Sequence, residues 1–176
     1  MTTNYRSFAF RPGTGGIVAV TGHRPDKLGG YDPENPIRVW VRDQLKKKLT
    51  ELRPKYCISG MALGVDQDFA RCCIELEIPF LAAVPFIGQE KKWPPESQRV
   101  YKELLAKAFQ VHVVSEGQYS SAKMQKRNEW MVDNCQTLIA VWDGSEGGTG
   151  NCVKYAGKIA RVMVRIDPND FNSIVK

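Results

Sequence analysis

The sequence contains few of the residues that build metal sites and disulfide frameworks. It has two histidines and five cysteines in 176 residues, and no two cysteines form a Cys-x-x-Cys pair. An odd cysteine count without paired spacing argues against a disulfide framework, and so few histidines argue against a zinc site. We therefore expect reduced thiols, no metal and no cofactor.

Long hydrophobic runs and clustered charge are also missing. No apolar run is long enough to cross a bilayer, and the N-terminus has no signal-peptide core, so we expect a cytoplasmic protein without a membrane partner. The net charge is +6, but the basic residues are scattered, and the densest cluster is Lys46–Lys48 on a predicted exposed helix face. Without a basic stripe interleaved with aromatics, nucleic acid is not expected as a partner.

The apolar content, 43% of the chain, is enough for one domain with a substantial core. Residues 1–15 have no periodicity and predict a flexible N-terminal arm. Residues 16–168 form the expected domain, and residues 169–176 form a C-terminal tail.

Continuous apolar runs alternate with amphipathic stretches along this domain. Unbroken apolar runs are typical of parallel strands that are covered on both faces. The strands are expected at Ile17–Thr21, Lys55–Ser59, Phe80–Pro85, Val111–Ser115, Thr137–Trp142 and Arg161–Ile166. The helices between them are expected from Pro36 to Leu52 and at Val65–Glu77, Glu96–Ala108, Ala122–Cys135 and Asn151–Ile159. This alternation predicts an α/β fold: one Rossmann-like, doubly wound, mainly parallel sheet of about six strands with helices on both faces.

Glycine-rich and polar turns follow several of these strands. Ligands of such sheets bind beyond the carboxyl ends of the strands, where backbone N–H groups at helix starts attract anions. There is no GxxxxGK[ST] motif, and no GxGxxG follows the first strand, so the P-loop and standard dinucleotide readings are excluded. The residues expected to bind a phosphate-bearing ligand at this edge are Gly22, His23, Arg24, Gly60, Met61, Gly64, Asp66, Asp143, Gly147, Gly148, Thr149 and Asn151.

Several of these residues also have a purely structural reading. His23 either contacts the ligand or caps strand-end carbonyls, and Arg24 either grips a phosphate or forms a surface ion pair. Asp66 either holds ribose hydroxyls or caps a helix. The Phe86–Gln98 segment is either a functional loop in which Trp93 stacks on a base, or a helix entry in which Trp93 covers the core.

Four motifs carry a family resemblance. "TGHRPDKLGG", "SGMALGVDQ", the Gln89–Trp93 loop and "RNEWMVDNCQTLIAVWDGSEGGTGN" together resemble the YpsA-like branch of the SLOG superfamily, from about Val18 to Val164. That superfamily groups DprA-like and LOG proteins, whose Rossmann-like domains are implicated in binding nucleotides and nucleotide-derived ligands. The resemblance implies a nucleotide-like small-molecule ligand, a dimer, and ligand contacts from Arg127 and Asn128.

LOG enzymes cleave the N-glycosidic bond of nucleoside 5′-monophosphates, and their signature is an Arg-Lys pair followed by PGGxGTxxE. Here Asn128 stands where lysine is usual, and the glutamates that should follow Thr149 are absent. Glycosidic cleavage needs a carboxylate. We therefore expect a binding module that acts as sensor, carrier or sequestering protein. The alternative is a LOG-like N-glycosidase or related transferase, in which Asp66 or Glu146 supplies the missing carboxylate. A DprA-like nucleic-acid module is a third possibility, which the lack of a basic stripe disfavours.

Overall fold

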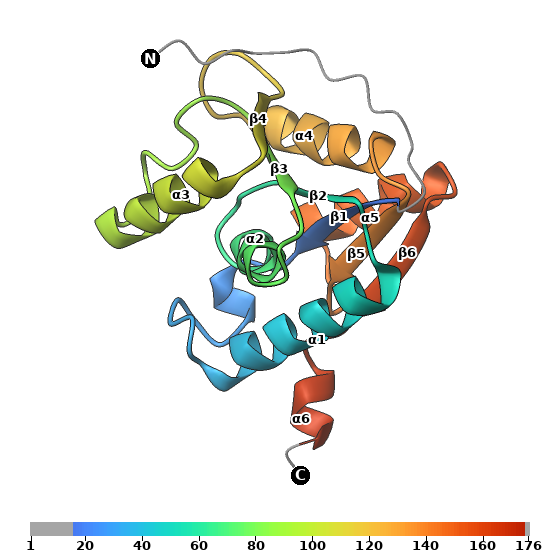
Figure 1. Cartoon of the computed structure of the whole chain (residues 1–176). Coiled ribbons are helices and arrows are strands. Elements are labelled where there is room, and N and C mark those ends of the chain that lie inside the picture. The colour runs from blue at the N-terminus through green and yellow to red at the C-terminus, as the bar shows by residue number, and fades with distance from the viewer. Residues whose placement is uncertain (1–15, 175–176) are drawn as a thin grey trace.

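A six-stranded parallel sheet forms the centre of the computed structural model, which describes residues 16–174 (Figure 1). Its strand order is β4-β3-β2-β1-β5-β6, and every neighbouring pair is parallel. The chain therefore builds outwards from β1 to β4, then returns past β1 to continue with β5. The strands are β1 (Ile17–Gly22), β2 (Tyr56–Ser59), β3 (Phe80–Val84), β4 (Gln110–Val113), β5 (Thr137–Val141) and β6 (Val162–Ile166).

Helices cover both faces of this sheet, and Figure 1 shows α1 and α4 on opposite sides of it. Helices α1 to α3 pack on one face, and α4 and α5 pack on the other. The predicted doubly wound α/β fold is confirmed. The helices are α1 (Pro36–Leu52), α2 (Val65–Glu75), α3 (Pro95–Lys107), α4 (Ser121–Asp133), α5 (Gly148–Lys158) and α6 (Asp170–Ile174), with a short 3-10 helix η1 (Pro25–Lys27).

The apolar run of β1 illustrates why a strand of this sheet has no polar residue at alternate positions. Successive side chains of a strand point to opposite faces of the sheet. Val18 and Val20 accordingly pack beneath α1–α3, whereas Ile17 and Ala19 pack beneath α4 and α5. Because both faces are buried, no position in these four residues is left for a polar side chain.

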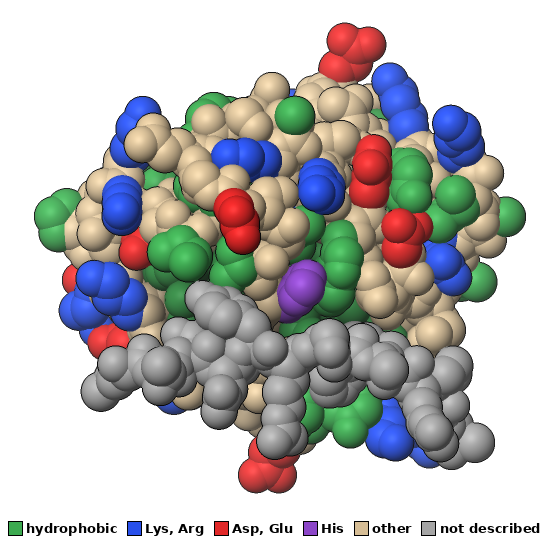
Figure 2. Space-filling model, turned by 90° about the horizontal axis from the view of Figure 1, so that it is seen from above, with side chains coloured by type: hydrophobic (Ala, Val, Ile, Leu, Met, Phe, Trp, Pro, Cys, Tyr) green, Lys and Arg blue, Asp and Glu red, His purple; other side chains and the backbone are tan. Residues whose placement is uncertain are grey.

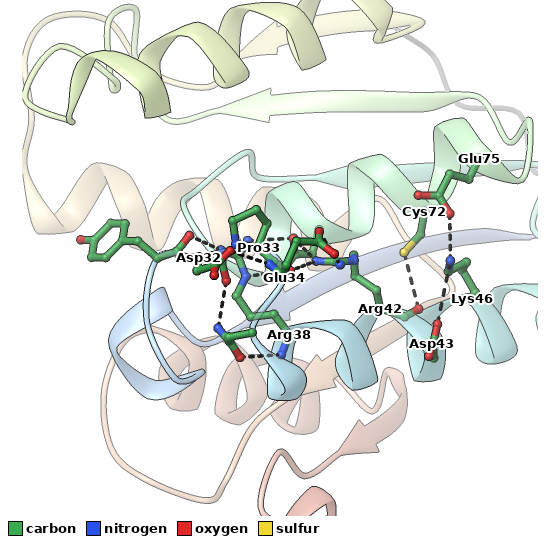
Figure 3. Close-up of polar contacts among 12 residues, drawn as sticks. Asp32, Pro33, Glu34, Arg38, Arg42, Asp43, Lys46, Cys72 and Glu75 are labelled. Atoms are coloured by element: carbon green, nitrogen blue, oxygen red, sulfur yellow. Dashed lines mark hydrogen bonds and ion pairs between the residues drawn. The ribbon is translucent and has the colours of Figure 1, made fainter.

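A buried carboxylate ties α1 to α2. Asp68 is fully buried and accepts hydrogen bonds from Nε and Nη2 of Arg38, at 3.0 and 2.8 Å, while Arg42 Nη1 lies 3.7 Å from it. Asn35 caps the start of α1 through its side chain, which accepts from the Arg38 backbone N–H at 3.1 Å. Figure 3 shows the polar contacts of Arg38, Arg42 and Lys46 along α1.

The ends of the chain add two details. The predicted C-terminal tail contains α6, and Phe171 of that helix lies 6.2 Å from the ring of Trp40. The predicted N-terminal arm, residues 1–15, lies outside the described residues. No helix in the described range is long and apolar enough to span a membrane, and no cluster of metal-ligating side chains occurs within that range. All five cysteines are free and buried. A cytoplasmic location stays a prediction.

We predict that Asp68→Asn lowers the free energy of unfolding by about 3–5 kcal/mol, because it leaves two arginines poorly paired at a buried site. Denaturant unfolding followed by circular dichroism measures the change. Glu75→Gln is the control: it removes the exposed partner of Lys46, 2.9 Å away, and is expected to cost less than about 1 kcal/mol. Equal losses in the two variants would contradict the role assigned to Asp68.

Candidate functional site

A pocket of about 460 Å³ opens at the carboxyl ends of β1 and β5, where the strand order reverses. This is the position at which open α/β sheets bind ligands, because the two flanking turns diverge to opposite faces of the sheet. Ten of the predicted site residues line it: Gly22, His23, Arg24, Asp66, Arg127, Asn128, Gly147, Gly148, Thr149 and Asn151. Glu146, the other catalytic candidate, also lines the pocket and is exposed.

Five predicted residues do not line this pocket: Gly60, Met61, Gly64, Trp93 and Asp143. Gly64 is one case where packing explains the residue. Its φ is +94°, and a side chain there would meet the His23 carbonyl oxygen at 2.5 Å. Trp93 lies instead in a neighbouring groove and packs edge-to-face on Tyr101, with ring centroids 5.3 Å apart.

His23 makes its closest contacts with the loop that follows β5. It is 5% exposed, and its Nε2 lies 2.8 Å from Asp143 Oδ1 and 3.1 Å from the Asp143 backbone nitrogen. The ring nitrogen donates to the carboxylate when it is protonated and accepts from the N–H when it is not. Hydrogen bonds from Ser145, and next the contact with His23, lower the pKa of Asp143. His23 thus joins the turns after β1 and β5 from within the pocket wall.

A buried guanidinium and a buried carboxyl face the pocket from α4 and α2. Arg127 is 4% exposed, donates to the Gly60 carbonyl and, through Nε, to Asn128 Oδ1 at 2.9 Å. Its Nη1 lies 3.9 Å from Oδ2 of Asp66, which also accepts from the Ala62 N–H at 3.2 Å. Burial raises the pKa of Asp66 and lowers the pKa of Arg127, since each charged form loses water, and the opposite charge of the partner offsets part of this.

Exposed charges of both signs and a helix start complete the rim, because Asp26 and Glu146 lie there as well as two cations. Arg24 and Lys27 are exposed, and Lys27 Nζ donates to the Ser145 hydroxyl, which bridges the turns after β1 and β5. Helix α5 begins at Gly148, where an added Cβ atom would meet no protein atom within 4 Å. The N–H groups and positive dipole of this helix start favour an anion there, and the glycine leaves it room.

Sequence reasoning missed the contribution of the loop between β4 and α4 and of the first residues of α4. Tyr119 and Ser121 line the pocket, as does Lys27 after β1. A signal was present for the first two, because they follow a predicted strand of the same parallel sheet. The rule applied to the other strand ends would have placed them at this edge.

The fold and this pocket together define a class of protein: a Rossmann-like domain with a partly basic cavity at the crossover of a doubly wound sheet. The model of the family described as "YspA SLOG family" matches residues 18–165. The chain belongs to this SLOG family, as the four sequence motifs predicted.

Relatives and solved structures agree with this assignment. The chain is 37% identical, over 161 residues, to the uncharacterized SPbeta prophage-derived protein YoqJ of Bacillus subtilis, covering 79% of this chain and 94% of that protein. It shares its fold with DNA processing protein A (DprA) of Streptococcus pneumoniae, with a TM-score of 0.62, 16% identity and 90% of this chain covered. DprA of Helicobacter pylori gives a TM-score of 0.61 at 17% identity, covering 90% of this chain and 71% of that one. The chain spans 55% of the pneumococcal protein's length.

These similarities correct one expectation from the sequence. The Helicobacter DprA is described by its single-stranded DNA binding mode, so the prediction that nucleic acid is not a partner is wrong. That prediction relied on the lack of a basic stripe. On the face drawn in Figure 2, lysines and arginines indeed lie scattered among acidic and apolar side chains. In this fold, however, the turn after β1 brings Arg24 and Lys27, and α4 brings Arg127, to one pocket, so these charges form no stripe along the sequence.

Proposed function

We propose that the pocket binds the phosphate of a nucleotide, and that single-stranded DNA supplies this nucleotide. The observation that carries the proposal is the convergence of Arg24, Lys27 and the start of α5 at the crossover between β1 and β5. Two side-chain cations and a set of backbone N–H groups there face the same cavity. Phosphate is the anion that such a combination recognises in nucleotide-binding α/β proteins.

The size and floor of the pocket support a nucleotide-sized ligand. Its volume, about 460 Å³, falls in the range of small-molecule sites. Arg127 holds the floor, and the open space over Gly148 lets a phosphate approach the backbone. Asp66 is buried in the same pocket and offers a carboxyl to hydrogen-bond donors of the nucleotide.

Two observations favour a strand over a free nucleotide. The fold is shared with two DprA proteins, one of them described as binding single-stranded DNA. The pocket is also continuous with a second groove, because Arg24, Tyr119 and Met124 line both. A strand needs such an open path, whereas a mononucleotide does not.

Gly148→Val tests this proposal cleanly, because the added Cβ meets no protein atom and projects into the space assigned to the phosphate. We expect it to weaken binding of a fluorescently labelled oligo-dT by about tenfold or more in an anisotropy titration at low salt. Gly148→Ala, the matched control, adds one methyl group and is expected to lose less affinity. Circular dichroism checks that both variants fold.

If Gly148→Val leaves the affinity for oligo-dT unchanged, the proposed phosphate position is wrong. Unlabelled thymidine 5′-monophosphate serves as competitor in the same titration. If the mononucleotide competes with the same affinity as the oligomer, the ligand is a free nucleotide and the strand is ruled out.

Asp66 supports a second function, cleavage of an N-glycosidic bond. It is the buried carboxyl of the pocket, and its raised pKa keeps the acid form present at higher pH than usual. An acid of this kind can protonate a departing base while water attacks the sugar carbon. The proton of Asp66 goes to the base, the hydroxyl of the water bonds to the sugar carbon, and the second proton of the water returns to the Asp66 carboxylate.

If the protein is such a hydrolase, incubation with nucleoside 5′-monophosphates releases free base, detected by chromatography. Asp66→Asn is expected to abolish this release while keeping the volume of the side chain. Glu146→Gln, at the exposed carboxylate of the rim, is the control and is expected to retain release. Nucleotide binding without any base release by the wild type would rule out the second function.

A further inference from the structure

A second cavity, of about 540 Å³, lies beside the pocket. We call it the Ile87 groove; its own residues are Phe86, Ile87, Gly88, Gln89, Lys91, Lys92, Trp93 and Gln118, and it shares Arg24, Tyr119 and Met124 with the first pocket. The groove is thus an extension of the proposed phosphate site along the segment between β3 and α3.

The walls of the groove carry several apolar and aromatic side chains, and part of this surface is exposed. Ile87 is 68% exposed and Tyr119 is 66% exposed, although large apolar side chains are usually covered. Phe86 meets Tyr119 in an edge-to-face arrangement, with centroids 6.2 Å apart and an interplanar angle of 80°. Trp93 is held in place by its edge-to-face contact with Tyr101. An aromatic ring system of a ligand finds stacking partners here.

One polar group in this apolar surface is incompletely satisfied. Gln89 is 8% exposed, and its Nε2 donates to the Tyr101 hydroxyl at 3.2 Å. The other end of the amide, Oε1, is buried and has no hydrogen-bond partner among the described residues. A buried acceptor without a partner is costly, so a rotation of the Gln89 side chain that brings Oε1 to a ligand N–H would recover a lost hydrogen bond.

The charges at the groove have one sign. Lys91, Lys92 and Arg24 line it, and none of its lining residues is acidic. All three are exposed, so their charges lie in solvent at the mouth of the groove. A ligand that fits must combine a flat apolar ring, an N–H donor at the edge of that ring, and a negative charge beside it.

We propose that the Ile87 groove binds a second nucleobase, linked through phosphate to the nucleotide in the first pocket. Its ring packs against Ile87 and the exposed face of Tyr119, its N–H edge meets the Gln89 amide, and its phosphate lies near Lys91 and Lys92. This inference rests on the proposed function of the first pocket. The second base comes either from the next nucleotide of a strand or from a dinucleotide.

Ile87→Glu tests the groove, because the side chain is exposed and lies outside the first pocket. Affinity is measured for thymidine 5′-monophosphate, for the dinucleotide pTpT and for NAD, by isothermal titration. In the wild type we expect pTpT to bind about tenfold more tightly than the monophosphate, because stacking of one additional base contributes about this much affinity. Ile87→Glu is expected to remove this gain and leave monophosphate affinity unchanged.

Ile174→Glu is the matched control, since Ile174 is 69% exposed and lies on α6, far along the chain from either cavity. It is expected to keep the full gain. A gain with pTpT assigns the groove to a strand, and a gain with NAD alone assigns it to a dinucleotide. The inference is wrong if neither pTpT nor NAD binds more tightly than the monophosphate, or if the gain in affinity is equal in Ile87→Glu and Ile174→Glu.

Gln89→Met tests the same site independently. The substitution keeps the length of the side chain and removes the amide oxygen. We therefore expect smaller differences in affinity among pTpT, pApA and pCpC, whereas the gain in affinity from stacking the second base persists. The proposed function fails separately, if the monophosphate and the dinucleotide both bind equally well to Gly148→Val and to the wild type.

Discussion

The candidate site depends on one buried guanidinium. Arg127 reaches from α4 to the carbonyl of Gly60 behind β2, and its neighbour Asn128 lies 3.5 Å from the Gly148 carbonyl at the start of α5. A Cβ at Gly60 would lie 2.3 Å from Nη1 of Arg127, so a side chain at that turn would displace the guanidinium. The charge is costly to bury, and Asp66 at 3.9 Å with the surrounding acceptors offsets that cost. Arg127 thereby connects α4 to the β2–α2 turn and α2, and Asn128 connects α4 to α5.

The topology then decides which turns meet. Because β1 and β5 are parallel neighbours, their carboxyl ends share one edge, and the helices that follow them diverge to opposite faces. His23 contacts Asp143, and Lys27 contacts Ser145, across this division. Contacts between residues 120 positions apart in the chain thus join the two turns. The first pocket and the Ile87 groove are continuous because Tyr119, which follows β4, lines both of them.

Much of this arrangement was predictable from the sequence. Apolar runs located all six strands within a residue or two. The runs of the inner strands β1, β2, β3 and β5 are unbroken because both faces are buried, whereas the edge strands β4 and β6 are more exposed. The turns after β1 and β5 were correctly assigned to one edge. Gly60 and Gly64 were not separable from ligand-binding glycines, since their need for a missing side chain arises from contacts with Arg127 and His23 that only the folded chain makes. The exclusion of nucleic acid relied on the lack of a basic stripe, whereas Arg127 of α4 joins Arg24 and Lys27 at one pocket only in the folded chain.

The proposed position of a nucleotide phosphate of single-stranded DNA is the start of α5, between the turns that follow β1 and β5. A titration of the ¹⁵N-labelled protein with oligo-dT, followed by amide chemical shifts, reports on this position residue by residue. We expect the largest shifts at the backbone amides of Gly148 and Thr149, with further shifts at Gly22 and Arg24. Shifts confined to other surfaces, such as β6 and α6, or no shifts at saturating oligo-dT, would contradict the proposed position.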